Sequence, residues 1–213
     1  MEGRLDSVER QLYSVGERLY SLETGQVKVV LVAAVAILFA FGFVPVVAHV
    51  APEHVVISEV QIADNEFVEL YNPTDSAIDM TGWHWCYYSS GRDWNNPYRD
   101  KTFPEDATLP SHGFYLIGLE GYPEPTSDWQ VYSSNQLSNS AGSVGIFPWD
   151  PKDKTVEEAK SGRIDAVGWG GVEYVNETQS AAVPGAGESI ERKSLYDGYA
   201  LCEDTNNNSE DLF

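Results

Sequence analysis

The side chains best suited to chemistry lie near the C-terminal end of the chain, where Asp204, Asn206 and Asn208 follow one another at every second position. This D-x-N-x-N spacing matches the first three ligand positions of a calcium-binding loop, because Ca²⁺ prefers carboxylate and amide oxygens. The match then fails, because Ser209 stands where the loop needs glycine and no glutamate occupies the twelfth position. The pattern predicts either a weak Ca²⁺ site or a structural turn in which asparagine side chains bond to the backbone.

Cys86 and Cys202 are the only two cysteines of the chain. In an oxidising compartment they could form one disulfide, and the alternative is a pair of buried free thiols. No histidine stands at a zinc-ligand spacing from either cysteine, so the sequence predicts no zinc site.

Motifs of catalysis are absent from the sequence. It contains no G-x-S-x-G, no phosphate-binding G-x-x-x-x-G-K and no H-E-x-x-H. We therefore expect no enzymatic activity and no cofactor other than the weak Ca²⁺ site.

Two stretches without alternating polarity, 87–107 and 122–132, are predicted to be long surface loops. Loops of this length often carry recognition residues, and aromatic side chains flanked by polar ones suit protein or carbohydrate surfaces. Trp94, Tyr98 and Trp129 are therefore candidate recognition residues. The alternative is that the two tryptophans fold back over the protein core. Two glycosylation sequons, at Asn176 and Asn207, matter only if the domain meets a glycosylation system.

The elements that must position these residues are short strands. From Val55 to Ile62 apolar and polar residues alternate, Asp64 and Asn65 suit a tight turn, and the alternation resumes from Phe67 to Tyr71. This pattern predicts a β-hairpin. Further short runs separated by Gly, Pro, Asn and Asp predict an all-β domain.

The same residues closely resemble the lamin-tail domain family, in a form typical of membrane-anchored prokaryotic or archaeal members. The resemblance rests on blocks in the family's order, at 57–60, 66–75, 79–83, 109–117, 137–146, 164–170, 187–193 and 204–213. It implies an immunoglobulin-like β-sandwich over residues 55–213.

A second long feature is the uncharged run 29–48. Twenty residues of helix span about 30 Å, the thickness of the hydrocarbon core of a bilayer. We therefore expect an N-terminal helix (1–26), a transmembrane helix (27–49) and a short linker (50–54) before the sandwich. The alternative is a signal peptide cleaved after Ala48, but the apolar run is longer than a typical signal core.

The flanking charges predict the orientation of this helix. Four cations precede the span, and the nearest one beyond it is Arg92. The positive-inside rule then predicts a single-pass protein of the cell membrane, with a cytoplasmic N-terminus and an extracytoplasmic sandwich.

The first 26 residues carry a heptad pattern. It predicts self-association or contact with a protein partner, and the alternatives are a helix on the inner membrane surface and disorder. The apolar positions are Leu5, Val8, Leu12, Val15, Leu19 and Leu22.

The charge of the chain bears on its partners. The formal net charge is −20, and the four cations and five acids before residue 51 leave −19 for the outer region. Such a surface repels phosphate backbones, so nucleic-acid binding, associated with metazoan members of the family, loses support here. The sequence thus favours a module for protein interaction or envelope structure, with glycan binding, divalent-cation binding or a role beside a hydrolase as the alternatives.

Overall fold

We describe the protein from a computed structural model. It describes residues 52–119, 122–123, 127–132, 137–185, 187–196 and 199–213, and only the backbone of residues 194–202. The expected N-terminal and membrane-spanning helices, 1–26 and 27–49, lie outside these ranges. Within the ranges, every helix is too short or too polar to cross a bilayer.

Short strands and very short helices make up the described part of the chain. In order they are β1 (Val56–Gln61), β2 (Phe67–Tyr71), β3 (Ile78–Asp79), β4 (His84–Ser89), β5 (Arg99–Thr102), β6 (Thr108–Leu109), β7 (Phe114–Gly118), β8 (Trp129–Gln130), β9 (Gly142–Phe147), the 3₁₀ helix η1 (Pro151–Asp153), α3 (Val156–Gly162), β10 (Asp165–Trp169), β11 (Ile190–Glu191), β12 (Ser194–Tyr196), β13 (Tyr199–Cys202) and α4 (Asn208–Asp211).

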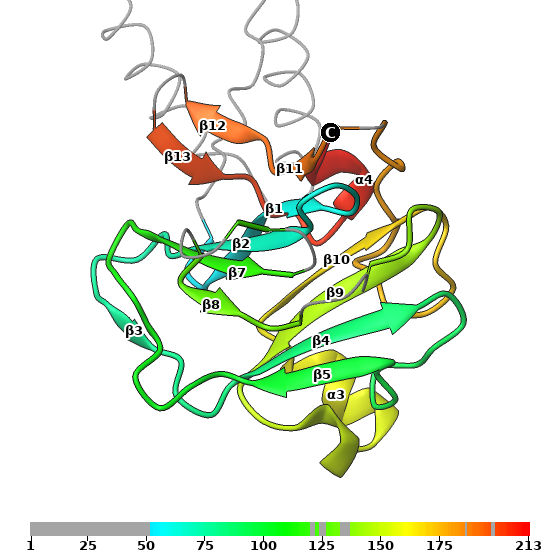
Figure 1. Cartoon of the computed structure of the whole chain (residues 1–213), viewed down its shortest axis with the longest axis horizontal. Helices are drawn as coiled ribbons and strands as arrows, with labels where there is room; N and C mark the ends of the chain where they lie inside the picture. The colour runs from blue at the N-terminus through cyan, green and yellow to red at the C-terminus, as the bar shows by residue number, and fades with distance from the viewer. Residues whose placement is uncertain (1–51, 120–121, 124–126, 133–136, 186, 197–198) are drawn as a thin grey trace, which may run out of the picture. The chain divides into compact units, whose positions relative to one another are not determined.

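Two sheets form a β-sandwich (Figure 1). The first has the strand order β11-β1-β2-β7-β8 and the second has the order β10-β9-β4-β5. Two smaller sheets, β3-β6 and β12-β13, accompany them. The predicted β-sandwich is confirmed.

The hairpin predicted from residues 55–71 is also confirmed. β1 pairs antiparallel with β2, with Val60 opposite Val68. The turn residues Asp64 and Asn65 have φ values of 51° and 66°. Asp and Asn adopt this left-handed conformation more readily than other side chains do, which is why they can end one strand and begin the next so tightly.

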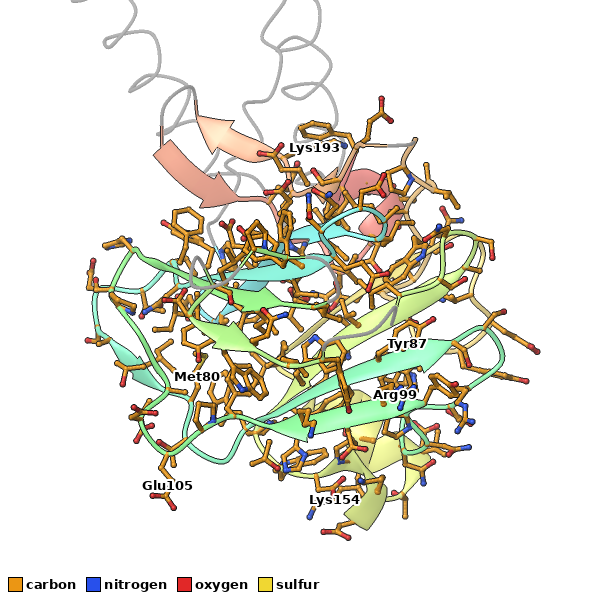
Figure 2. All side chains as sticks on the ribbon, viewed as in Figure 1. Met80, Tyr87, Arg99, Glu105, Lys154 and Lys193 are labelled. Carbon is orange, nitrogen blue, oxygen red and sulfur yellow. The ribbon has the colours of Figure 1, made fainter. Side chains whose placement is uncertain are left out.

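The main core lies between the two sheets. Trp85 from β4 and Trp169 from β10 are fully buried in it, together with aliphatic residues of β1, β2 and β7. Met80 is also fully buried. In Figure 2 its side chain lies inside the sandwich, whereas that of the exposed Glu105 points away from it.

A smaller second core lies on the other face of the second sheet, under α3. Thr155 caps this helix, accepting a hydrogen bond from the backbone of Glu158 while the Glu158 side chain accepts one from Thr155. The helix contributes Ala159 to a cluster that contains Cys86, Tyr88 and Phe147. Residues of β4 at every second position therefore face this second core and not the first.

Candidate functional site

A buried guanidinium lies where the first strand, β10 and the C-terminal segment meet. The Arg192 side chain is fully buried and lies within 4.0 Å of four carboxylates. Arg192 Nη2 is 2.9 Å from Asp165 Oδ1 and 3.6 Å from Glu177 Oε2, while Nη1 is 3.3 Å from Asp204 Oδ1 and 3.4 Å from Asp211 Oδ2. We call these five residues the buried charge network.

The network also holds backbone groups far apart in the sequence. Arg192 Nε donates to the carbonyl oxygen of Ile57 at 2.9 Å, and Asp165 Oδ2 accepts from the Ile57 N–H at 2.6 Å. Both backbone groups of Ile57 are thus bound by buried charges. Because an unpaired buried charge is strongly unfavourable, the network fixes β1 against the rest of the fold.

Burial and neighbouring charges shift the pKa values of two acids of the network in opposite directions. Desolvation raises the pKa of Glu177 to about 8, Asp165 and Asp204 act in the same direction, and Arg192 and Arg163 oppose them. Burial would also raise the pKa of Asp204, but the hydrogen bond from His54 and the Arg192 charge lower it to about 2. His54 thereby joins the network from the segment just before β1.

Asp204, Asn206 and Asn208, the candidate Ca²⁺ ligands, point to different partners in the structure. Asp204 contacts Arg192 and His54, while Asn206 Oδ1 accepts from Arg163 Nη2 at 3.2 Å. Asn208 is fully buried, and its Oδ1 accepts from the backbone N–H groups of Gly168 and Glu177. Asn208 thus binds backbone groups as the turn alternative expects, and the choice between a turn and a weak Ca²⁺ site stays a prediction.

Cys86 is a buried free cysteine. It lies in the second sheet between Asp100 of β5 and Gly145 of β9, and it faces the second core. Cys202 lies in β13, paired with β12, and its side chain is outside the described part. The structure therefore shows no bridge at Cys86, because this thiol is enclosed by apolar side chains.

The candidate glycosylation sites are both half-buried. Asn176 Nδ2 donates to the carbonyl oxygen of Val172 at 3.1 Å. Asn207 Oδ1 accepts from Ser209 Oγ at 2.9 Å. A glycan on Asn176 would therefore crowd the bond that its nitrogen makes, whereas the Asn207 bond is made by the oxygen that a glycan leaves free.

The predicted recognition residues separate into one exposed and two covered side chains. Tyr98 is 51% exposed, whereas Trp94 is 2% exposed and belongs to the second core. Trp129 packs against the main core and lies 4.7 Å from Phe103 between ring centroids. Trp94 is therefore a packing residue, whereas the recognition role of the half-buried Trp129 stays a prediction. Stretch 87–107 is also not one loop, because it contains β5.

Tyr98 lies in a group of cations and aromatic rings on β5, an edge strand whose one partner in its sheet is β4. Arg92 and Arg99 lie over the Tyr98 ring, with guanidinium carbons 5.3 Å and 5.1 Å from its centroid. Arg99 and Lys101 also lie over the Tyr132 ring. Figure 2 shows the Arg99 side chain on β5. We call Arg92, Tyr98, Arg99, Lys101 and Tyr132 the edge patch.

The cations of the edge patch are not paired with acids in the part of the chain that the structure describes. Among the described residues, no carboxylate lies within ion-pair distance of Arg92, Arg99 or Lys101, although acids far outnumber cations in this domain. Arg99 Nε is buried and makes no hydrogen bond in this part of the chain. The patch is therefore a local concentration of unneutralised positive charge around an exposed tyrosine.

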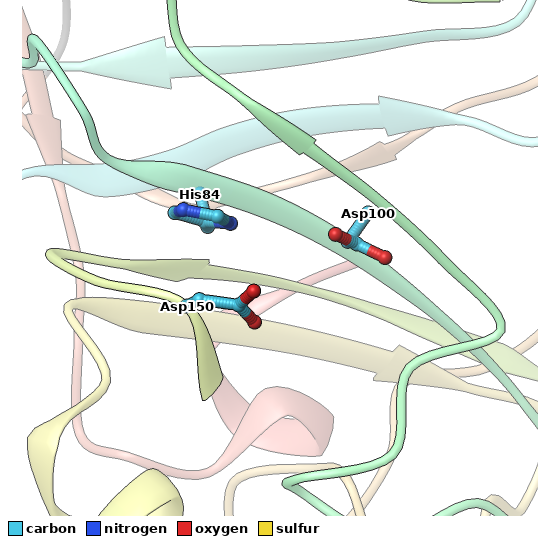
Figure 3. A group of neighbouring side chains, drawn as sticks. All are labelled: His84, Asp100 and Asp150. Atoms are coloured by element: carbon cyan, nitrogen blue, oxygen red, sulfur yellow. The ribbon is translucent and has the colours of Figure 1, made fainter. Parts of the chain in front are cut away.

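Three possible metal ligands, His84, Asp100 and Asp150, converge on the opposite face of β5 (Figure 3). Their ligand atoms lie within 4.8 Å of one another. The Lys152 ammonium already contacts both carboxylates, at 2.7 Å from Asp100 Oδ2 and 3.5 Å from Asp150 Oδ2. This lysine supplies the positive charge that a metal ion would otherwise bring.

Sequence reasoning missed the buried charge network. The available signals were Asp165 within the apolar run IDAVGWG and Arg192 two residues after the apolar Ile190. A charged residue inside a buried strand needs a partner, so these two positions could have been proposed as a pair.

The model of the Lamin Tail Domain family matches residues 49–171, more than half of the chain. No curated protein matches the sequence. Among solved structures, the chain is similar to a DUF4876 family protein from Bacteroides thetaiotaomicron, with a TM-score of 0.54 and 14% identity over 76% of this chain and 70% of that one. At this identity the likeness concerns the fold alone.

Proposed function

Because this chain belongs to the Lamin Tail Domain family, and because its sandwich presents one unneutralised basic surface, we propose that it is a non-enzymatic interaction module that binds an acidic protein partner through the edge patch. The observation that carries the proposal is the set of three cations over two tyrosine rings, with Arg92 and Arg99 over Tyr98 and Lys101 over Tyr132. In a region with a charge of −19 such cations would be expected to pair with its own acids, and with the acids that the structure describes they do not.

Tyrosine and arginine are the side chains most enriched at the centres of protein interfaces. Tyr98 offers a large, rigid ring, and the cations beside it would attract carboxylates of a partner and exclude basic surfaces. An acidic segment could thus gain both apolar contact and charge-assisted hydrogen bonds at one place.

The edge patch also indicates how a partner would dock. The Tyr132 hydroxyl donates to the carbonyl oxygen of Asp100 at 3.0 Å, so a side chain already covers part of the free edge of β5. In the pairing of β4 with β5, Arg99 lies opposite Tyr87 and Lys101 lies opposite Trp85. Because Tyr87 and Trp85 face the main core, the two cations lie on the same side of the sheet as this core. Charged and covered edges discourage strand addition. A partner would therefore bind through side chains and not as an additional strand.

We further propose that the module is held at the cell membrane by residues 29–48 and faces away from the cytoplasm. The support comes from the sequence: an uncharged run long enough to span a bilayer, and cations on its N-terminal side only. Protease added to intact cells should then cleave the sandwich domain, and full protection would contradict this orientation.

The edge patch can be tested by site-specific photocrosslinking in native membranes. A photoreactive phenylalanine analogue at position 98 should give a discrete adduct with another protein. The yield of this adduct should fall when both Arg92 and Arg99 are replaced by glutamine, and it should decrease with added salt. Tyr174 is a matched control, because it is a tyrosine exposed to a similar extent, 46% against 51%. No adduct at position 98, or the same adduct from position 174, would contradict the proposal.

A further inference from the structure

A pocket of about 660 Å³ opens on another part of the domain, beside the buried charge network. It is formed by the end of α3, the segment 172–180 and the turn that contains Asn206. Its volume falls in the range of small-molecule sites. None of the residues of the edge patch lines it.

Two amide side chains of the pocket are fixed by a hydrogen bond to the side-chain oxygen, which leaves the NH₂ group of each for another partner. Gln179 Oε1 accepts from Ser209 Oγ at 3.1 Å, and Asn206 Oδ1 accepts from Arg163 Nη2 at 3.2 Å. In the part of the chain that the structure describes, the NH₂ groups of both amides lack a partner. Two donors are therefore fixed in position and available to acceptors such as sugar hydroxyl oxygens.

The positive charges of the pocket are Lys160 and Arg163. Arg163 is held firmly, with its guanidinium 5.2 Å from the Trp94 ring and its Nη2 3.0 Å from Glu177 Oε1. Lys160 is exposed, and within the described ranges no carboxylate lies at ion-pair distance from it. The lysine is thus the cation that a bound anion could reach.

The acids of the pocket limit the charge of a ligand. Glu173 and Glu177 both line it, so an anion with several charges, such as a polyphosphate, would be repelled. Glu177 lies 3.0 Å from Arg163 Nη2 and 3.6 Å from Arg192 Nη2, so its charge is already balanced by these two cations. The balance suits a ligand with a single negative charge.

An aromatic ring and two strained residues complete the pocket. Tyr174 is 46% exposed and offers a flat face on which a sugar ring can stack. Thr178 and Asn206 have φ values of 55° and 56°, and Thr178 Oγ1 donates to the carbonyl oxygen of Asn206 at 2.8 Å. Such a conformation is rare for a β-branched residue and is often found where a loop is shaped for a ligand.

We propose that this pocket binds an acidic sugar, a hydroxyl-rich ring that carries one carboxylate. Lys160 contacts the carboxylate, the amides of Gln179 and Asn206 donate to ring hydroxyls, and Tyr174 packs on the apolar face of the ring. This binding is independent of the proposed protein partner at the edge patch.

The test is a titration of the full-length protein in detergent with galacturonate oligomers, followed by calorimetry. Binding in the millimolar range or tighter is expected, with galactose oligomers at least about tenfold weaker because they lack the carboxylate. Lys160→Met and Tyr174→Ala should each weaken galacturonate binding by about tenfold. Both side chains are at the surface, so the fold should survive, and an unchanged melting curve would verify this.

Lys101→Met is the matched control, because it removes a surface cation of the edge patch and should leave sugar binding unchanged. If the crosslink at position 98 is lost while sugar binding persists, only the proposed function fails. Absence of galacturonate binding, equal binding of the neutral oligomer, full competition by inorganic phosphate, or insensitivity to both pocket variants would each overturn the sugar site.

Discussion

Arg192 Nη2 lies 2.9 Å from both carboxylate oxygens of Asp165, and neither side chain has any exposed surface. The two residues are 27 positions apart, and Arg192 also reaches Ile57, 135 positions away. The Arg192 side chain therefore joins three parts of the sandwich that are far apart in the sequence: β1, β10 and the C-terminal segment.

Replacing Arg192 with methionine should lower the free energy of unfolding by about 3–5 kcal/mol, because it leaves buried carboxylates without their cation. Urea unfolding followed by the fluorescence of the buried Trp85 and Trp169 would measure this loss. Arg92→Met is the control and should change stability by less than about 0.5 kcal/mol. Equal effects of the two variants would show that the network does not support the fold.

The free energy of unfolding should decrease as the pH rises from acidic values through neutrality. The hydrogen bond to Asp204 raises the pKa of His54 above its usual 6.5. A raised pKa in the folded state means that the contribution of this pair is complete below 6.5 and is lost as the pH passes through the raised value. Glu177 acts in the same direction, because folding raises its pKa from 4.5 to about 8, so its contribution is lost as the pH rises between these two values.

Denaturation at several pH values between about 4 and 9 would test this dependence. His54→Gln should flatten the slope in part, and the remaining slope should come from Glu177. Asp165, Asp204 and Arg192 also face this group, so the variant should be compared with the wild type at each pH. Identical slopes for the two proteins would rule out His54 as a contributor.

Two adjacent glycines should differ in their tolerance of alanine. Gly170 and Gly171 have φ values of 68° and 74°. Alanine at either position would be destabilised by about 1–2 kcal/mol, because a side chain disfavours this left-handed backbone conformation. A Cβ at Gly170 would also collide with the backbone carbonyl of Ser140, whereas one at Gly171 meets nothing within 4 Å. Gly170→Ala should therefore cost about 3 kcal/mol or more in total. Equal melting temperatures for the two variants would contradict the packing at Gly170.

The Cys86 thiol should be unreactive in the folded protein. Burial raises its pKa well above the usual value, and the thiolate is the reactive form. In a Cys202→Ser chain, maleimide should not modify Cys86 under native conditions and should modify it fully in urea. Rapid native labelling would show that the second core is open.

Local pattern was sufficient to predict the first hairpin. The alternation around the buried Val68 and Leu70 depends only on neighbours in the sequence. The same holds for the turn at Asp64 and Asn65. The strand β1 departs from strict alternation, because the pairing register shifts between Ile57 and Glu59. Such a shift depends on the partner strand and cannot be read from β1 alone.

Trp94 shows why the candidate site was predicted only in part. Its neighbours in the sequence resemble those of an exposed recognition residue, yet it is buried because α3 and Arg163 pack over it from more than 60 positions away. Tyr98, four residues further on, stays exposed because it follows the turn and precedes the edge strand. Exposure is set by tertiary neighbours, and the sequence alone does not specify these.

The bonds between Ile57 and Arg192 also determine when the domain can finish folding during synthesis. A ribosome releases β1 first, but both backbone partners of Ile57 lie at residues 165 and 192. Until those residues leave the exit tunnel, β1 can pair with β2 but cannot be fixed in the sandwich. Final closure must therefore wait until nearly all of the domain has emerged, and a chain stalled before residue 192 should be recognised by chaperones or proteases as incomplete.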